Sequence, residues 1–272
     1  MNKTPRLSKS AIEYLDYVWN FASGCTKGCS YCYAKKIATR FPGHYPNGFE
    51  PMLYPEAFCS PMRLKKPSII GVGYMGDLFD DAIDPAAKVE ALLPSEQFSV
   101  SMSLKGWIET TIKECPQHRF LFLTKQPRNL EKWAPFPDNC WVGVSATDRD
   151  SFNDAIWYLK DVEASVRYIS FEPLLADPVV GILDNRRYQW PVMHGSIVEN
   201  VLDWIIIGAQ TKPTVQPDIE WVRQIVAAAD AAGIPVFLKD SLKPLIGVYP
   251  EIVRPKGVKI TLPGELRQEM PK

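Results

Sequence analysis

Residues 202–238 read LDWIIIGAQTKPTVQPDIEWVRQIVAAADAAGIPVFL, and this stretch has the pattern of a strand, a helix and a second strand. The two outer runs, Leu202–Gly208 and Ile234–Leu238, are apolar nearly throughout, as expected of parallel strands covered on both faces. Between them, Asp218 is a suitable N-cap, apolar residues recur on one helical face, and Gly233 ends the helix. The stretch therefore predicts a βαβ unit.

The same alternation extends over most of the chain. Further expected strands are Tyr17–Ala22, Ser68–Tyr74, Arg119–Thr124, Cys140–Ser145 and Arg167–Phe171. Helical periodicity covers Ser103–Cys115 and Ser151–Val162. Repeated strand–helix units predict an α/β fold with a mostly parallel sheet, either a barrel or an open doubly wound sheet.

We expect one domain over residues 1–272, with its core at about 17–240. A proline-rich excursion, residues 41–67, follows the first helix and is expected to pack over one mouth of the fold. A second irregular insertion contains Pro173, Pro191 and His194. Residues 241–272 are expected to form a C-terminal extension that ends in a tail or a covering strand.

Composition excludes several classes of protein. The chain has 272 residues, of which 46% are hydrophobic and 23% charged, which is typical of a globular chain and not of a disordered, collagen-like or coiled-coil one. Its 31 basic and 31 acidic residues argue against binding nucleic acid by bulk charge, although a local basic groove remains open. No window has the roughly 18 apolar residues of a membrane span, and the charged start lacks a signal-peptide core. We expect a cytoplasmic protein with no membrane partner.

The six cysteines are unevenly distributed, and three of them lie within residues 25–32. Cys25, Cys29 and Cys32 have the spacing C-x₃-C-x₂-C, and Gly24 and Gly28 give that loop the freedom to wrap around one centre. Thiolates suit iron–sulfur clusters or zinc. A structural zinc site completed by His44 or Cys59 is the alternative. The isolated Cys59, Cys115 and Cys140 are expected to be small buried hydrophobes.

Polar residues follow the expected strands, at the edge where α/β folds gather their chemistry. These residues include the cysteine loop, Asp77, the Thr124–Gln126 segment, Ser145, Thr147, Glu172 and Gln210.

The cysteine triplet, with aromatic Tyr31 directly before its third cysteine, resembles that of the radical S-adenosylmethionine (SAM) superfamily. The strand–helix alternation agrees with the partial (β/α)6 TIM-like barrel of that superfamily. Nearly the whole chain also resembles a phage-associated branch of radical-SAM-like proteins that is distantly similar to spore photoproduct lyase. The segments that carry this resemblance are Gly24–Ala34, Met75–Phe79, Phe122–Lys125, Gly143–Ser145, Ser170–Leu174, Ile206–Gly208 and Val236–Lys239.

The resemblance implies a 4Fe–4S cluster held by Cys25, Cys29 and Cys32, with one iron left open for the amino and carboxylate groups of SAM. Reductive cleavage of SAM would give a 5′-deoxyadenosyl radical that abstracts hydrogen from a substrate. The chemistry then belongs to the cofactor, while the protein supplies position and exclusion of water. An electron donor of the flavodoxin or ferredoxin type is implied.

The same resemblance implies further site residues. Tyr31 and the backbone around Gly208 would lie near the adenine. Gly76 and Asp77 stand where the superfamily often has Gly-Gly-Glu, whose backbone receives the SAM amino group, so Asp77 is the less certain match. Ser145, with Thr147 as a second candidate, would contact the ribose, and Glu172 would contact the ribose or the substrate. The candidate catalytic residues are Lys125 and Lys239.

Other motifs are weaker. Gly71-x-Gly73-x-x-Gly76 fits a dinucleotide fingerprint, but no amphipathic helix follows it. Asp77, Asp80, Asp81 and Asp84 form an acidic cluster, which we interpret as a solvated loop with a helix N-cap, a divalent-ion site being the alternative. The histidines His44, His118 and His194 are far apart, and none is assigned to a metal.

The resemblance is the main ground for expecting a nucleic-acid substrate. Basic and aromatic residues near the cysteines agree with it, since aromatic side chains stack on bases, although such residues are also common on helix faces and in cores. Phage members of the resembling branch are associated with hypermodified thymine, which implies modification or isomerisation of a nucleobase in DNA or a nucleotide, in the host cytoplasm. A base within a duplex would have to be flipped out. A small molecule or peptide as radical SAM substrate is one alternative, and a zinc-stabilised nucleic-acid-binding protein without catalysis is another.

Overall fold

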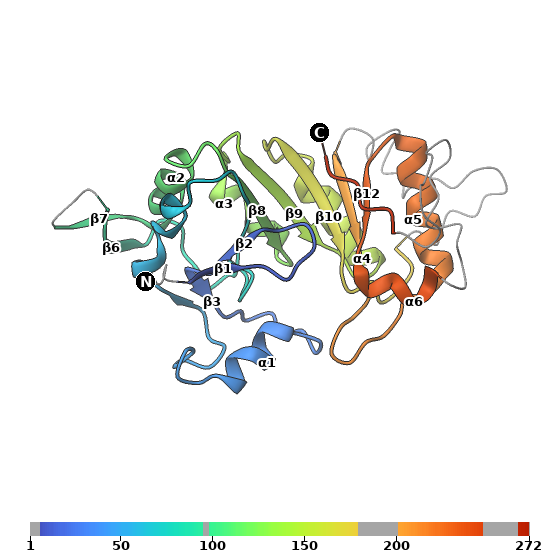
Figure 1. Cartoon of the computed structure of the whole chain (residues 1–272), viewed down its shortest axis with the longest axis horizontal. Helices are drawn as coiled ribbons and strands as arrows, with labels where there is room; N and C mark the ends of the chain where they lie inside the picture. Colours follow the sequence, from blue (N-terminus) through green and yellow to red (C-terminus); the bar gives the residue numbers. More distant parts are fainter. Residues whose placement is uncertain (1–5, 95–97, 179–200, 247–265, 272) are drawn as a thin grey trace. The chain divides into compact units, whose positions relative to one another are not determined.

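The structure is a computed structural model that describes residues 6–94, 98–178, 201–246 and 266–271 (Figure 1). The second irregular insertion, with Pro191 and His194, lies largely outside the described residues, and so does most of the expected C-terminal extension.

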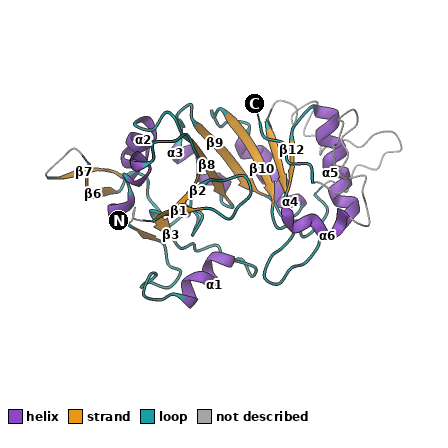
Figure 2. Ribbon diagram, viewed as in Figure 1, coloured by secondary structure: helices purple, strands orange, loops and turns teal. Residues whose placement is uncertain are grey.

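The main sheet has eight strands within the described residues, in the order β1-β2-β5-β8-β9-β10-β11-β12. Figure 2 colours the strands orange and the helices purple. The strands of this sheet are β1 (Leu7–Lys9), β2 (Tyr17–Trp19), β5 (Ile69–Val72), β8 (Arg119–Thr124), β9 (Cys140–Ser145), β10 (Val166–Phe171), β11 (Trp204–Ile207) and β12 (Val236–Leu238).

Strand direction and order identify the fold class. The pairs β2–β5, β5–β8, β10–β11 and β11–β12 are parallel, and β1 pairs with β2 in the antiparallel sense. From β2 onward the strands follow one another in chain order, whereas the order reverses in a doubly wound sheet. The structure is thus an α/β fold with a largely parallel sheet, which confirms the predicted class and is compatible with a partial TIM-like barrel.

The chain divides into two compact units, Met1–Val142 with Val162–Ser165 and Gly143–Asp161 with Val166–Lys272. In the first unit, aromatic side chains packed at tilted and edge-to-face angles form part of the core. The ring centroids of Trp19 and Phe21 lie 4.5 Å apart, those of Phe21 and Phe58 5.6 Å, and those of Phe58 and Trp107 5.7 Å. These rings join β2 to α2 (Leu104–Lys113), and the unit also contains α1 (Tyr33–Arg40) and α3 (Leu130–Trp133).

In the second unit, α4 (Arg149–Leu159) and α5 (Ile219–Ala232) accompany the strands, and α6 (Lys243–Ile246) follows β12. Asp148 forms a capping box with Ser151 at the start of α4. Asp218 caps α5, and Gly233 ends it with φ of 69° in the left-handed region, as predicted. The expected helices at Ser103–Cys115 and Ser151–Val162 are confirmed as α2 and α4, within a few residues at each end.

Three features were not predicted. The expected strand Tyr17–Ala22 ends early at Trp19, and the chain then forms β3 (Ala22–Ser23), which pairs with β4 (Met52–Leu53) of the proline-rich excursion. Strands β6 (Lys88–Leu92) and β7 (Ser99–Ser103) form an antiparallel hairpin. Edge strand β1 is the third. These strands are short or mostly exposed, so they lack the apolar pattern that marks the central strands.

The end of the described chain lies against β12. Leu238 N donates to Arg267 O at 2.8 Å, and Phe237 and Gln268 form an antiparallel bridge. This short pairing agrees with a covering strand at the end of the expected extension. No helix within the described residues is long and apolar enough to cross a membrane.

Candidate functional site

The loops that follow β2–β3, β5 and β8 meet at the first cysteine, all within the first unit. Gly24 N donates to Met75 O at 3.0 Å, and Asp77 N donates to Gly24 O at 3.2 Å. Gly24 and Gly76 thereby form an isolated parallel bridge. The carboxyl ends of parallel strands lie at one edge of a sheet, which brings segments distant in sequence together here.

The close approach of these two backbones requires glycine. A Cβ at Gly76 would lie 2.3 Å from Gly24 O and 2.7 Å from Gly24 N, and a Cβ at Gly24 would lie 2.3 Å from Glu50 O. Gly24 also has φ of 87°, in the left-handed region that side chains rarely adopt. Gly76, predicted as a SAM contact, therefore has a packing role in the structure.

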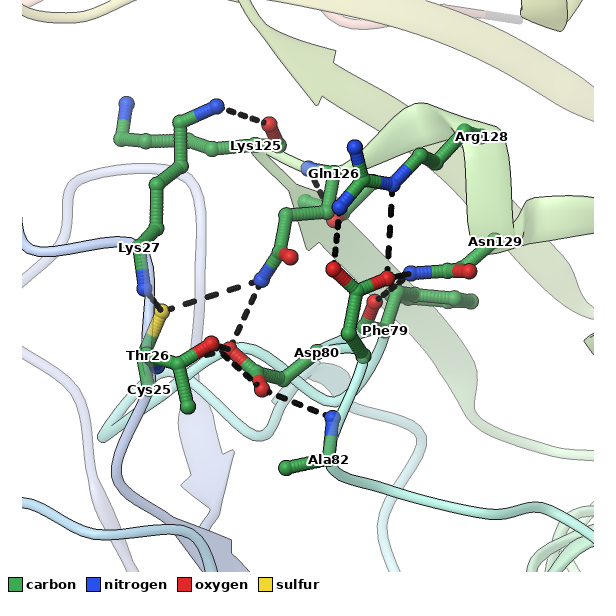
Figure 3. Close-up of polar contacts among 12 residues, drawn as sticks. Cys25, Thr26, Lys27, Phe79, Asp80, Ala82, Lys125, Gln126, Arg128 and Asn129 are labelled. Carbon is green, nitrogen blue, oxygen red and sulfur yellow. Dashed lines mark hydrogen bonds and ion pairs between the residues drawn. The ribbon is translucent and has the colours of Figure 1, made fainter.

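Asp80 connects the cysteine loop to the loop after β8 (Figure 3). Its carboxylate accepts hydrogen bonds from Thr26 N at 2.7 Å, Thr26 Oγ1 at 2.9 Å and Gln126 Nε2 at 2.8 Å. Ala82 N donates to it from its own loop at 3.0 Å. Burial acts to raise the pKa of Asp80, but these hydrogen bonds outweigh it and hold the pKa below its ordinary value.

Asp77 organises the same loop from a deeper position. It accepts hydrogen bonds from Thr124 Oγ1 at 2.8 Å, Lys125 N at 2.9 Å and Phe79 N at 3.0 Å. Burial raises the pKa of Asp77, and the nearby Asp80 charge adds to the rise, although the three donors oppose it. Asp77 is 6% exposed and fully engaged by this chain, so its side chain serves to hold the end of β8 in place.

A third carboxylate extends this contact toward α3. Arg128 forms an ion pair with Asp81. Asn129 Nδ2 donates to Asp81 Oδ1 at 2.8 Å and to Phe79 O at 2.8 Å (Figure 3). Three aspartates of one loop thus bind the segment that follows β8.

The three cysteines of the loop are free thiols and half-buried. Lys27 N donates to Cys25 Sγ at 3.4 Å. Cys32 is the N-cap of α1, where its Sγ accepts from Lys35 N at 3.4 Å. Burial raises the pKa of Cys25 to about 12. The Lys27 N–H opposes this rise in pKa, and the Asp77 and Asp80 charges add to it.

These donors can be compared with what a metal group needs. The free thiols on one glycine-containing loop, with backbone N–H groups directed at two sulfurs, are the donor set of a thiolate-bound cluster. Within the described residues, no group of three or more histidine, cysteine, aspartate or glutamate side chains is close enough to hold a metal ion. The type of donor, three free thiols with N–H groups at two of the sulfurs, fits an iron–sulfur cluster. The three sulfurs are not close enough together to hold a single metal ion.

Two other predicted site residues accompany the cysteine loop. Lys125 Nζ lies 5.5 Å from the centroid of the half-buried Tyr31 ring, within cation–π range. Lys27 Nζ donates to Lys125 O at 2.8 Å (Figure 3). The first unit therefore brings together Cys25, Tyr31, Gly76, Asp77 and Lys125.

In the second unit, Glu172, Gly208 and Lys239 form a cluster at the ends of β10, β11 and β12. Lys239 Nζ lies 2.7 Å and 2.8 Å from the two carboxylate oxygens of Glu172. A Cβ at Gly208 would lie 3.1 Å from Lys239 Cδ and 3.2 Å from Glu172 Cγ, so glycine leaves room for both side chains. The Lys239 side chain is 9% exposed. This ion pair, between a buried lysine and a half-buried glutamate, is what the structure adds to the predicted residues of the second unit.

Ser145 and Thr147 are the other predicted site residues of this unit, and they lie at the end of β9 and next to the start of α4. Ser145 is the last residue of β9 and is buried. Thr147 N donates to Ser151 Oγ at 2.9 Å, and Thr147 Oγ1 donates to Asp148 Oδ2 at 3.1 Å. Thr147 therefore takes part in the cap of α4.

The interpretation of the acidic cluster as a solvated loop with a helix N-cap is wrong. Asp77 and Asp80 are buried, because hydrogen-bond donors of neighbouring loops satisfy both carboxylates, and only Asp81 and Asp84 are exposed. No helix starts at this loop, and the next element is β6. No helix follows the glycine fingerprint either, as predicted.

The three isolated cysteines are buried, as predicted. Cys59, Cys115 and Cys140 are buried free thiols. His44 is exposed and His118 is buried beside Phe120. His194 lies outside the described residues.

Sequence reasoning missed the roles of Thr26, Asp80 and Gln126. Thr26 lies between two cysteines, and Asp80 was grouped with its acidic neighbours. Gln126 was noted only as one of the polar residues after a strand. Their positions at the ends of neighbouring strands were the available signal, but only the structure pairs them.

Comparison with protein families gives a match over most of the chain. A family model described as "Protein of unknown function (DUF5131)" matches residues 9–243. Neither the curated proteins nor the solved structures include a significant match to the chain.

Gly76→Ala should disturb the cysteine loop. The new Cβ would meet the Gly24 backbone, which cannot move aside as a flexible side chain would, and overpacking of this kind costs about 1–3 kcal/mol. We expect a lower free energy of unfolding in urea and faster hydrogen exchange in residues 24–32. Gly43→Ala is the matched control, since no atom lies within 4 Å of its added Cβ. Equal stability of the two variants would show that the close approach is not required.

Proposed function

The chain belongs to the DUF5131 family, which is described as being of unknown function, and we propose that it is a radical SAM enzyme. In this proposal, Cys25, Cys29 and Cys32 hold the iron–sulfur cluster. The observation that carries the proposal is the position of the cysteine loop. It stands at the carboxyl end of a parallel sheet, where the loops after β5 and β8 are bonded to its first residues. In α/β folds, this edge carries the chemistry.

When bound there, a 4Fe–4S cluster supplies one electron to the sulfonium of SAM, which divides into methionine and a 5′-deoxyadenosyl radical that takes hydrogen from a substrate. The electron comes from a donor of the flavodoxin or ferredoxin class. The three thiolates would hold the cluster and leave one iron for the amino and carboxylate groups of SAM.

The chain's own residues prepare this site. The Gly24–Gly76 approach and the Asp80 contacts fix the backbone before Cys25, and the N–H groups of Lys27 and Lys35 direct hydrogen bonds at two of the sulfurs. Backbone donors of this kind stabilise negative charge on sulfur. Tyr31 presents a half-buried ring beside the Lys125 ammonium, which gives an aromatic surface for the adenine and a cation for a carboxylate.

In the second unit, we propose the Glu172–Lys239 pair as a group that binds hydroxyl groups of a ligand. Glu172, partly exposed, can accept hydrogen bonds from hydroxyl groups, and Lys239 holds its carboxylate in one orientation. Lys239 is also proposed as a catalytic residue.

We propose that the substrate is a nucleobase, for example a modified thymine in DNA. The segment 25–49 contains Lys27, Lys35, Lys36 and Arg40 but no aspartate or glutamate, and all four basic side chains are exposed. Tyr33 and Phe41 on this segment are 43% and 47% exposed. Exposed cations suit phosphates, and the aromatic rings between them suit bases. Segment 25–49 is thus positively charged, although the net charge of the whole chain is zero.

The cluster proposal is tested by anaerobic purification and reduction. We expect a brown, iron-containing protein that releases 5′-deoxyadenosine from SAM after reduction with dithionite, because all three cysteine ligands are needed for the cluster. Cys29→Ala should abolish this release. Cys115→Ala, at a buried cysteine outside the loop, should retain it.

Two results would contradict the cluster proposal. A colourless protein with one zinc would support the zinc-stabilised binding protein instead. A full complement of iron without release of 5′-deoxyadenosine would exclude radical chemistry.

The substrate proposal is tested by nucleoside analysis. Unmodified DNA and DNA with hypermodified thymine are incubated with the reduced, SAM-supplied protein and with Cys29→Ala, then digested to nucleosides. We expect one nucleoside to change in mass or retention time only with the intact protein, since the radical acts on a base. Identical nucleosides in both reactions, with 5′-deoxyadenosine still released, would favour a small molecule or peptide.

A further inference from the structure

The side chain of Gln126 bridges the Asp80 carboxylate and the first cysteine (Figure 3). Its Nε2 lies 2.8 Å from Asp80 Oδ2 and 3.9 Å from Cys25 Sγ. The residue is 7% exposed, so water competes little for these contacts. One buried amide group thus serves two acceptors that belong to different loops.

The backbone of Gln126 is fixed on both sides. Gln126 N donates to Thr124 Oγ1 at 2.8 Å, and that hydroxyl in turn donates to the buried Asp77. Gln126 O accepts from Asn129 N at 3.1 Å. These hydrogen bonds hold the Gln126 backbone in place, and the contacts with Asp80 and Cys25 set the direction of its side chain.

Asp80 determines which end of the amide faces the cysteine loop. If the amide were turned over, its oxygen would face the Asp80 carboxylate, and two acceptors would repel each other. With the NH₂ group toward Asp80, one N–H is used there and the second remains for another acceptor. The sulfur of Cys25 is that acceptor.

From this geometry we infer that Gln126, oriented by Asp80, is a positioning residue that donates a hydrogen bond to Cys25 Sγ and sets the reduction potential of the centre at that cysteine. The inference rests on the proposed function. Hydrogen bonds to sulfur are one of the quantities that tune iron–sulfur potentials. The reduced cluster carries one more negative charge than the oxidised cluster, so an N–H donor at its sulfur favours reduction.

Gln126→Leu removes the donor while keeping a side chain of similar size. In the full-length reconstituted protein, we expect the midpoint potential to become more negative, because the reduced state loses a stabilising contact. The sulfur contact is long, so the change should be modest, about threefold in the reduced-to-oxidised ratio at a fixed potential, or about 28 mV at 59 mV per tenfold. Gln117→Leu is the matched control and should leave the potential unchanged, since Gln117 Nε2 contacts Leu64 O and His118 instead.

A second variant and a second measurement guard against misfolding. Asp80→Asn keeps the size of the side chain but removes the carboxylate that orients Gln126. Loss of a nearby negative charge by itself favours the reduced cluster, so hydrogen exchange, and not the potential, is the readout for this variant. In the metal-free chain, Asp80→Asn should speed hydrogen exchange in residues 24–32, because Thr26 N loses its carboxylate partner.

The outcomes separate this inference from the proposed function. A Gln126→Leu protein with full iron content and the wild-type potential would overturn the role of Gln126 while leaving the cluster in place. Iron analysis that finds no cluster in the wild-type protein would overturn both. Faster exchange in Asp80→Asn with no change of potential in Gln126→Leu would show that the contact is structural only.

Discussion

The buried Asp80 carboxylate is the interaction on which the candidate site depends. It accepts hydrogen bonds from Thr26 in the cysteine loop, from Gln126 after β8 and from Ala82 in its own loop. A buried charge is tolerated only when it is fully hydrogen-bonded. Moving any of these three segments away would leave the Asp80 carboxylate without one of its donors. The first cysteine is thereby attached to the sheet edge through its neighbours rather than through its own side chain.

Much of the fold could be predicted because its central strands are buried on both faces. The apolar runs at β5, β8, β9, β10, β11 and β12 and the capped helices α4 and α5 have strong local signals, and the structure confirms them. The β6–β7 hairpin and the early end of β2 could not be predicted in this way. They depend on pairing between segments distant in sequence or on mostly exposed strands, for which hydrophobic periodicity gives no signal.

The candidate site was predictable in its residues but not in its connections. The spacing of Cys25, Cys29 and Cys32 marks the loop, and polar residues at strand ends mark its surroundings. Sequence could not show that Asp80 is buried, because an aspartate next to other aspartates is normally solvated. Its burial depends on donors about fifty residues away along the chain on either side, at Thr26 and Gln126. Gly76 illustrates the same limit, since its close contact with Gly24 exists only in the folded chain.

The central claim is that the three loop cysteines hold a redox-active cluster with one iron open to SAM. The most direct measurement is the electron paramagnetic resonance spectrum of the reconstituted, dithionite-reduced protein before and after addition of SAM. The account predicts the signal of a reduced 4Fe–4S cluster that changes when SAM is added, because the amino and carboxylate groups of SAM bind the open iron. An absent cluster signal, or a cluster signal that SAM leaves unchanged, would contradict it.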